Sequence, residues 1–236
     1  MKTELLYFND SYLREFNAKV LEVKDGKYAV LDKTIFYPSG GGQPHDTGVM
    51  SCNGDDFPVV YVGKLSGDVR HEVGRDGLKA GDEISGKVDW ERRYRLMRMH
   101  TAAHIIDAVL YKEAGALCTG NQLGLDKSRI DFSLESLDRD KMQQYIDAAN
   151  EFVKKAIGLK IYYLKREDAL KIPGVVKLAS VMPPNVAELR IVEIPGVDLQ
   201  ADGGTQVKNT SEIGEIKFLS VENKGKDNRR MYYTLS

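Results

Sequence analysis

The 236-residue chain has little cysteine, no long apolar run and almost no net charge. Its two cysteines, Cys52 and Cys118, form no CxxC pair, so a disulfide scaffold is not expected and a reducing cytoplasm is favoured. No apolar run approaches the ~20 residues of a membrane helix. The N-terminal residues MKTELLYFND also lack the apolar core of a signal peptide. We therefore expect a cytoplasmic protein without a membrane partner.

The charges nearly cancel, because 34 basic residues face 35 acidic ones. A nucleic-acid partner would have to be bound by local basic patches, since there is no overall basic field. The hydrophobic content of 42% is ordinary for a globular protein, and the length suits one large domain or two small ones.

Short runs rich in Val, Tyr and Leu dominate the first part of the chain, at residues 18–23, 27–31 and 57–62. Turn signals such as Asp25-Gly26 and Gly54-Asp55 separate them. Many short strands with frequent turns favour a small barrel. We predict a β-rich, barrel-like domain over residues 1–88.

The pattern changes to a helical period near residue 89. We predict helices over residues 90–114 and 137–157, and strands over 129–132, 160–164, 189–194 and 215–221. This combination is typical of an α+β domain with helices packed on an antiparallel sheet. The predicted fold class is therefore α+β, with a second domain over residues 89–236.

The sharpest local feature is the sequence His100-Thr101-Ala102-Ala103-His104. Residues i and i+4 lie on one helix face, so the two imidazoles could bind one metal ion. Zincin proteases place a Glu beside the first His, and Thr101 at that position argues against protease chemistry. HxxxH also arises by chance, and zinc needs further ligands, for which His45 and His71 are not obvious candidates.

A polar loop follows near the end of the chain, at residues 198–214. Gly203-Gly204 allows a tight turn, and Asp202 and Gln206 on either side of it could point the same way. A capped surface turn is the simpler interpretation of these residues alone.

Taken together, the motifs resemble the editing domain of alanyl-tRNA synthetase and its free-standing relatives, the AlaX proteins. That family carries an HxxxH motif, often HTAxH, and a second motif resembling CGGTH followed by VxNTGEIG. Here HTAAH at residues 100–104 is followed by DGGTQVKNTSEIG at residues 202–214. Residues 36–48, 129–132 and 224–230 resemble further family segments, so the matches cover most of the chain and suggest the medium-length AlaX class.

The resemblance implies a hydrolase that removes serine or glycine wrongly attached to tRNA(Ala), with tRNA as its partner. It also implies one zinc or other divalent ion per chain, held by His100, His104, Asp202 and Gln206. The sequence departs from the family here, because Asp202 and Gln206 replace a Cys and a His. Loss of the thiolate should lower the affinity for zinc and raise the tolerance for harder ions. The site could bind metal weakly, bind another metal, or be empty.

The resemblance also suggests substrate contacts. The backbone N–H groups of Gly203 and Gly204 could support catalysis by His100 and His104 as an oxyanion or phosphate cradle. Thr119 occupies the place of a hydroxyl that would contact serine, and Gln43, Gly41 and Gly42 lie in the Gly-rich motif. The alternatives are an ordinary strand residue for Thr119, a surface loop residue for Gln43, and a small core residue for Cys118.

Two basic clusters could contact tRNA phosphates, although charge runs are usually solvated faces. The first cluster adjoins the histidine pair, and acidic residues dilute the second. The first consists of Arg92, Arg93, Arg95 and Arg98, and the second of Lys224, Lys226, Arg229 and Arg230.

Three other functions remain open. The chain could be a tRNA-binding relative that has lost catalysis, an editing enzyme for a different aminoacyl-tRNA, or a metallohydrolase of small esters with the same fold. The sequence does not predict the oligomeric state.

Overall fold

The computed structural model describes residues 3–65, 67–135, 138–175 and 186–236. The chain packs as two compact units, Met1–Leu96 and Met97–Ser236. The division falls within the long helix α1 (Trp90–Ala114), eight residues after the boundary expected between residues 88 and 89.

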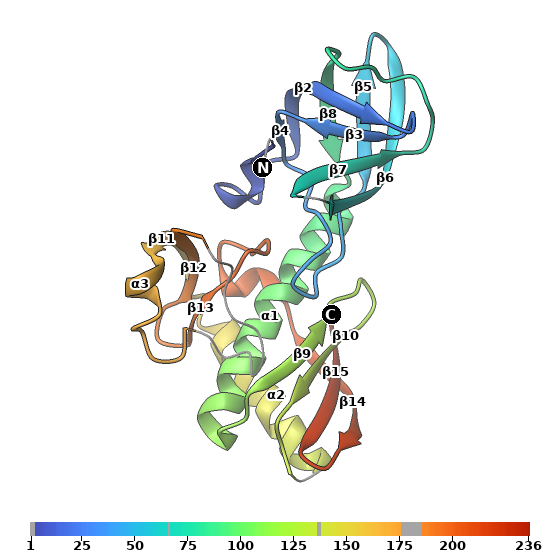
Figure 1. Ribbon diagram of the computed structural model, residues 1–236. Coiled ribbons are helices and arrows are strands. Elements are labelled where there is room, and N and C mark those ends of the chain that lie inside the picture. Colours follow the sequence, from blue (N-terminus) through green and yellow to red (C-terminus); the bar gives the residue numbers. More distant parts are fainter. Residues whose placement is uncertain (1–2, 66, 136–137, 176–185) are drawn as a thin grey trace. The chain divides into compact units, whose positions relative to one another are not determined.

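The first unit is a small closed barrel, drawn in blue to green in Figure 1. Neighbouring strands pair antiparallel in the order β2-β3-β7-β6-β5-β8. Residues alternate between the interior and solvent, as in β8, which buries Ile84, Gly86 and Val88. A Cβ on Gly86 would lie 2.2 Å from the ring of Phe16, so only glycine fits there. The predicted barrel is confirmed.

The strands of this unit are short. The barrel strands are β2 (Glu15–Lys24), β3 (Tyr28–Leu31), β5 (Gly48–Cys52), β6 (Asp55–Leu65), β7 (Asp68–Val73) and β8 (Glu83–Val88). Strands β1 (Glu4–Leu5) and β4 (Lys33–Thr34) pair with each other in parallel, and a 3-10 turn, η1, covers Leu6–Phe8.

The Gly-rich motif of this unit forms a tight turn. Gly40 and Gln43 pair through both backbone hydrogen bonds, and the two glycines between them have φ values of 58° and 82°. Positive φ at both central positions defines a type I′ turn, which favours glycine. Gln43 is buried and Gly41 is exposed at the tip, so the motif has a structural explanation within this unit.

Arg93, on the first turns of α1, is completely buried beside Asp46. Its Nε donates to both carboxylate oxygens at 3.0 Å, and Nη1 donates to the carbonyl oxygen of Ser11 at 3.0 Å. The prediction that Arg93 belongs to a phosphate-binding cluster is therefore wrong. Its guanidinium ties α1 to the barrel unit.

The second unit is α+β, as predicted, and contains two antiparallel sheets (Figure 1). One has the order β14-β15-β10-β9, and helix α2 contacts its strand β14. The other has the order β11-β12-β13. Helix α2 buries Met142, Ile146, Ala149 and Val153 and is capped by the side chain of Asp138, which accepts from two backbone N–H groups.

The elements of this unit after α1 are β9 (Cys118–Gln122), β10 (Ser128–Phe132), α2 (Arg139–Lys154), β11 (Lys160–Lys165), α3 (Arg166–Ala169), β12 (Glu188–Ile194), β13 (Asp198–Ala201), η2 (Thr210–Ile213), β14 (Ile216–Gly225) and β15 (Asn228–Leu235). The expected second helix and the four expected strands correspond to α2, β10, β11, β12 and β14, whereas β9, α3, β13, η2 and β15 were not predicted. The expected start of the second helix, Leu137, lies outside the described residues. Among the described helices, none combines the length and the apolar character needed to cross a bilayer.

Candidate active site

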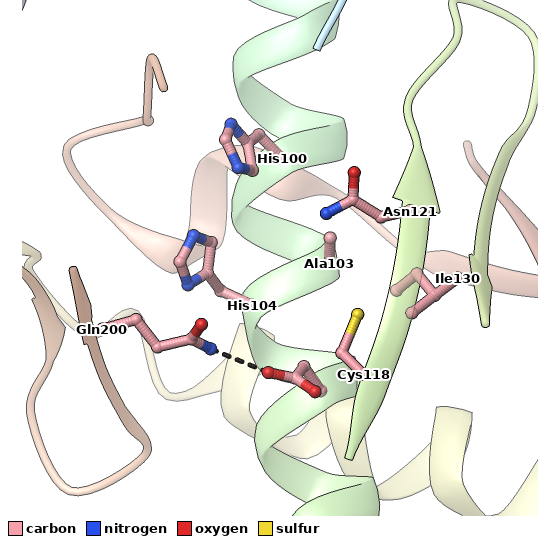
Figure 2. A pocket seen from close by; sticks show the side chains of 8 residues that line it. His100, Ala103, His104, Cys118, Asn121, Ile130 and Gln200 are labelled. Atoms are coloured by element: carbon pink, nitrogen blue, oxygen red, sulfur yellow. Dashed lines mark hydrogen bonds between the residues drawn. The ribbon is translucent and has the colours of Figure 1, made fainter. Parts of the chain in front are cut away.

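Helix α1 carries both histidines of the HTAAH motif on one face (Figure 2). Both side chains are buried, and their ring centroids lie 5.2 Å apart. Asp107 follows three residues later on the same helix and is buried as well. The positions 100, 104 and 107 form one stripe of polar groups along helix α1.

A second polar row faces this stripe from strand β13 and the residue that follows it. Asp198, Gln200 and Asp202 alternate with other residues, and side chains at i, i+2 and i+4 of an extended chain point to one side. The hairpin β12–β13 holds the row in place, because the backbone N–H of Asp202 donates to the carbonyl of Arg190 at 3.1 Å.

Asp202 meets the two histidines. Its Oδ1 lies 3.5 Å from Nε2 of His100, and its Oδ2 lies 3.9 Å from Nε2 of His104. One donor atom of each residue lies within 4.8 Å of the others. Donors around an ion with bonds of about 2.1 Å are roughly 3.4 Å apart in a tetrahedron. The three side chains could therefore hold a divalent ion if the cluster contracted around it.

The carboxylate of Asp202 is firmly held. Its Oδ2 accepts from the backbone N–H of Gly204 at 2.9 Å and from Nε2 of Gln206 at 3.0 Å. Burial opposes its charge, but His100, His104 and Arg190 stabilise the anion and keep the pKa of Asp202 well below its usual range. Arg190 is buried and donates to the carbonyl oxygens of Asp202 and Gly204. Asp202 is thus an ionised, preoriented donor.

Gln206, expected as a fourth ligand, has another role. Its Oε1 accepts from the hydroxyl of Thr101 at 2.7 Å, which turns the amide nitrogen toward Asp202. An amide oxygen engaged in this way does not face the donor cluster. The structure thus brings His100, His104 and Asp202 together, and it places the amide nitrogen of Gln206 on the carboxylate of Asp202.

Gly203 and Gly204, expected as a backbone cradle, lie in the turn beside Asp202. The N–H of Gly204 is used by Asp202, and Gly203 is exposed. The turn supports the carboxylate of Asp202, and the N–H of Gly204 is not directed at a substrate.

His104 is oriented by Asp198, which sequence analysis missed as a site residue. Nδ1 of His104 lies 2.8 Å from Oδ2 of Asp198, so Nε2 faces Asp202. Burial disfavours a charged imidazole, but the hydrogen bond and charge of Asp198 outweigh it and raise the pKa of His104. For His100, burial dominates and lowers the pKa to about 4, against the charge of Asp202.

Gln200 connects the two polar rows. Its Nε2 donates to Oδ2 of Asp107 at 2.8 Å, the dashed line in Figure 2. The same nitrogen lies 3.2 Å from Oδ2 of Asp198. The alternation Asp198-x-Gln200-x-Asp202 was present in the sequence as a period of two, which is the signal that could have revealed these residues.

A small pocket opens beside the histidines (Figure 2). Its empty volume is about 320 Å³, including the mouth. The lining residues are His100, Ala103, His104, Asp107, Cys118, Asn121, Ile130 and Gln200. The thiol of Cys118 donates to the carbonyl of Gly120 at 3.5 Å, and burial raises its pKa to about 12. Cys118 is thus a neutral wall residue and not a nucleophile.

Thr119 does not line this pocket, contrary to expectation. Its side chain is exposed, and its hydroxyl donates to Oδ1 of Asn228 at 3.0 Å. A β-bulge explains the difference, because the pairing with β10 shifts between Asp131 and Phe132. The extra residue reverses the alternation, so that Cys118 and Asn121 share the inner face.

The predicted phosphate contacts are largely occupied. Arg98 donates to the carbonyl oxygens of Ile213 and Ser236, at 2.6 Å and 2.8 Å. Arg229 is buried in the β14–β15 turn, and Arg230 forms two hydrogen bonds to Asp131. Arg98 and Arg230 therefore have structural partners, and the prediction that Arg229 contacts phosphates is wrong. Exposed cations remain at Lys224 and Lys226, and Arg92 is partly exposed, although its Nε donates to the carbonyl of His45.

Residues 189–232 match the family described as the threonyl and alanyl tRNA synthetase second additional domain. Residues 6–92 match the family described as class II (A) tRNA synthetases. One matched segment lies in the barrel unit and the other in the unit Met97–Ser236.

The similarity extends over the whole chain. Alanyl-tRNA editing protein AlaX-M of Methanosarcina acetivorans is 53% identical, over 99% of both chains. The protein of the same name from Saccharolobus solfataricus is 48% identical, again over 99% of both. Alanine–tRNA ligase of Methanococcus maripaludis is 39% identical over 94% of this chain, which corresponds to 25% of the ligase. The chain belongs to the AlaX-M family of alanyl-tRNA editing proteins.

Proposed function

We propose that this chain hydrolyses the ester bond of mischarged tRNA(Ala) and releases serine or glycine. Its AlaX-M relatives support the class of substrate. The observation that carries the chemistry is the meeting of His100, His104 and Asp202 beside a small pocket. Because these residues all lie in the unit Met97–Ser236, we assign hydrolysis to that unit and its helix α1.

Ester hydrolysis needs an oriented substrate, a positioned water and stabilisation of the oxyanion. A divalent ion on His100, His104 and Asp202 would supply Lewis acidity for water or substrate. The chain itself provides orientation. Asp198 fixes the ring of His104, and Gln206 and Gly204 fix the carboxylate of Asp202. Such supporting hydrogen bonds commonly accompany metal-binding histidines and carboxylates.

We propose zinc, or another divalent ion, in one copy per chain. Two imidazole nitrogens and one carboxylate form a donor set used by catalytic zinc, with a position left for water or substrate. The set contains no thiolate, which reduces the advantage of zinc over harder ions such as Mn²⁺.

The partner we propose is tRNA, and a charged-tRNA substrate implies a cytoplasmic location. Among the predicted basic residues, the exposed Lys224 and Lys226 and the partly exposed Arg92 and Arg95 are the ones we assign to phosphate contacts. Substitution of such residues should weaken tRNA binding without changing the metal content.

The test is a deacylation assay on tRNA(Ala) charged with serine, glycine or alanine. We expect Ser-tRNA(Ala) to be hydrolysed faster than Ala-tRNA(Ala), and we expect dialysis against a chelator to abolish the activity. Readdition of zinc or manganese should restore it and identify the preferred ion. A His104→Ala variant should be inactive in the same assay.

Other outcomes would contradict the proposal. Binding of tRNA without deacylation would indicate a relative that has lost catalysis. Hydrolysis of a different aminoacyl-tRNA, or of small esters only, would indicate one of the other functions that the sequence left open.

A further inference from the structure

The sheet β11-β12-β13 carries the row of Asp202 on one of its two faces. Residues that lie directly opposite each other in an antiparallel pair project from the same face. Val192 of β12 lies opposite Gln200 of β13. One step further along, the backbone N–H of Asp202 donates to the carbonyl oxygen of Arg190. Val192 and Arg190 therefore project from the face that carries Asp202.

The same face continues on β11, at the outer edge of this sheet (Figure 1). Tyr163 lies opposite Arg190, and Ile161 lies opposite Val192. Asp202, Arg190 and Tyr163 thus form one row across the sheet. Because neighbouring strands are about 4.8 Å apart, the backbone of Tyr163 lies roughly 10 Å from that of Asp202.

Exposure to solvent changes along this face. Arg190 and Val192 are 7% and 0% exposed, whereas Tyr163 and Ile161 are 45% and 40% exposed. Single exposed apolar residues are ordinary on a protein surface. Here two of them adjoin, and both lie on the face that carries the carboxylate of the donor cluster. We call Ile161 and Tyr163 the β11 patch.

The surroundings of the β11 patch favour a nucleotide as its occupant. Lys165 follows Tyr163 on the same face and is exposed, although the exposed Glu188 opposite it offsets one charge. Lys208 is also exposed, and its carbonyl oxygen accepts from the backbone N–H of Leu159, one residue before β11. An exposed aromatic ring with cations nearby can bind single-stranded nucleic acid through base stacking and phosphate contacts.

From this geometry we infer that Tyr163 stacks on the base of the terminal adenosine, the nucleoside that carries the misattached amino acid. The inference rests on the proposed deacylation, which places the ester at the donor cluster. The ester and the base lie at opposite ends of the ribose, so the base can rest on Tyr163 with no further nucleotide between them. Stacking there holds the ester beside Asp202 and contributes to binding, since the ring does not touch the reacting atoms.

The experiment uses the full chain and two small substrates, 3′-O-seryl adenosine and the same ester of a ribose without a base. Tyr163→Ser removes the ring, and Tyr163→Phe keeps the ring but removes the hydroxyl. Tyr61→Ser is the matched control, because Tyr61 is 43% exposed but belongs to the barrel unit. The measured quantities are kcat and KM, the Kd of the nonhydrolysable 3′-amide of seryl adenosine, the metal content and the melting temperature.

We expect Tyr163→Ser to raise the KM for seryl adenosine about tenfold, as loss of one base–aromatic stack does, and to change kcat less than about twofold. The Kd of the amide should rise by the same factor. The KM for the base-free ester should be equal in all four proteins. Tyr163→Phe and Tyr61→Ser should match the parent protein, and metal content and melting temperature should not change.

Several outcomes would overturn the inference. Equal rises in KM for the two substrates would show that the base is not involved, and a loss in Tyr163→Phe as large as in Tyr163→Ser would show that the ring is not. A parent dimer that dissociates on Tyr163→Ser in sedimentation would assign the β11 patch to a contact between two copies. A parent protein that deacylates neither seryl adenosine nor Ser-tRNA(Ala) would overturn the proposed function and the inference together. A parent that deacylates Ser-tRNA(Ala), with an unchanged KM for seryl adenosine in Tyr163→Ser, would overturn the inference alone.

Discussion

Nδ1 of His104 lies 2.8 Å from Oδ2 of Asp198, on the strand that faces helix α1. A carboxylate in this position fixes the ring orientation and the tautomer, so that Nε2 is presented to Asp202. Asp198 belongs to the same row as Gln200 and Asp202, which makes the hairpin β12–β13 the support of the whole cluster.

We predict that Asp198→Asn lowers the affinity for zinc roughly 10–100-fold, the usual effect of removing such a partner. The measurement is competition with a chromophoric chelator. Asp131→Asn is the matched control, because Asp131 is also a partly buried carboxylate of this unit but pairs with Arg129 and Arg230. Equal affinities of the parent protein and Asp198→Asn would show that the hydrogen bond does not orient the donor.

Asp202 and Gln206 should differ in their effects on metal binding. Asp202→Asn removes the anionic member of the three-donor cluster, and we expect it to abolish stoichiometric zinc binding. Gln206→Leu removes only one hydrogen bond to that carboxylate, so we expect a loss of about tenfold. Elemental analysis after dialysis measures the zinc stoichiometry of each variant, and chelator competition measures its zinc affinity. A larger loss in Gln206→Leu than in Asp202→Asn would restore Gln206 as a ligand.

The barrel unit should lose stability in acid because of His71. This ring is buried between the hydroxyl of Thr34 and the carbonyl of Ala29, and burial lowers its pKa from 6.5 to about 4. Between those values the unfolded chain takes up a proton that the folded barrel does not bind. Stability is therefore full above pH 6.5 and falls as the pH drops toward 4, by about 3 kcal/mol in total.

The fluorescence of Trp90 reports this transition, because Trp90 is the single tryptophan and packs against the barrel core. Urea unfolding is compared at pH 7 and pH 5 for the parent protein and His71→Gln. The variant should lose less stability on acidification than the parent. Identical pH dependence would mean that His71 does not contribute.

Sequence periodicity predicted the position of several elements well. Helix α1 begins and ends where expected, although its residues 101–110 are buried on every side, and β10 begins one residue before the expected start. Strand β15 was not predicted, although its residues alternate between buried and partly exposed positions. Its arginines suggested a basic surface run, whereas Arg229 and Arg230 pair within the sheet region.

The part of the site that follows from local helix geometry was predicted, and the part that depends on contacts between distant segments was not. The spacing of His100 and His104 follows from helix geometry, so their shared face was predictable. The position of Thr119 was not, because a bulge depends on pairing with β10 and leaves no mark in the local sequence. The orientation of Gln206 depends on Thr101, which is 105 positions away.

Arg93 and Asp46 should be a structural pair. Removal of one member leaves an uncompensated buried charge, so Asp46→Asn should destabilise the barrel unit by about 3–5 kcal/mol. Replacing both with apolar residues of similar size should recover much of that loss. Urea unfolding followed by Trp90 fluorescence measures each variant. A double variant as unstable as Asp46→Asn would show that the hydrogen bonds of Arg93 to Ser11 and Ile35 matter more than the pair.

Restoring the family's Cys and His at positions 202 and 206 should raise the affinity of the site for zinc. The side chains at positions 202 and 206 already lie in contact, with Nε2 of Gln206 3.0 Å from Oδ2 of Asp202. Asp202→Cys would place a thiolate beside His100, and Gln206→His would place an imidazole beside that thiolate. Together with His100 and His104 they would give four donors that suit zinc. We expect zinc affinity at least tenfold above that of the parent protein and a smaller response to Mn²⁺, both measured by chelator competition. Because Gln206 now accepts from Thr101, Gln206→His alone should gain less than the double variant. A double variant that binds no more zinc than the parent protein after dialysis would show that donor chemistry does not limit affinity at this site.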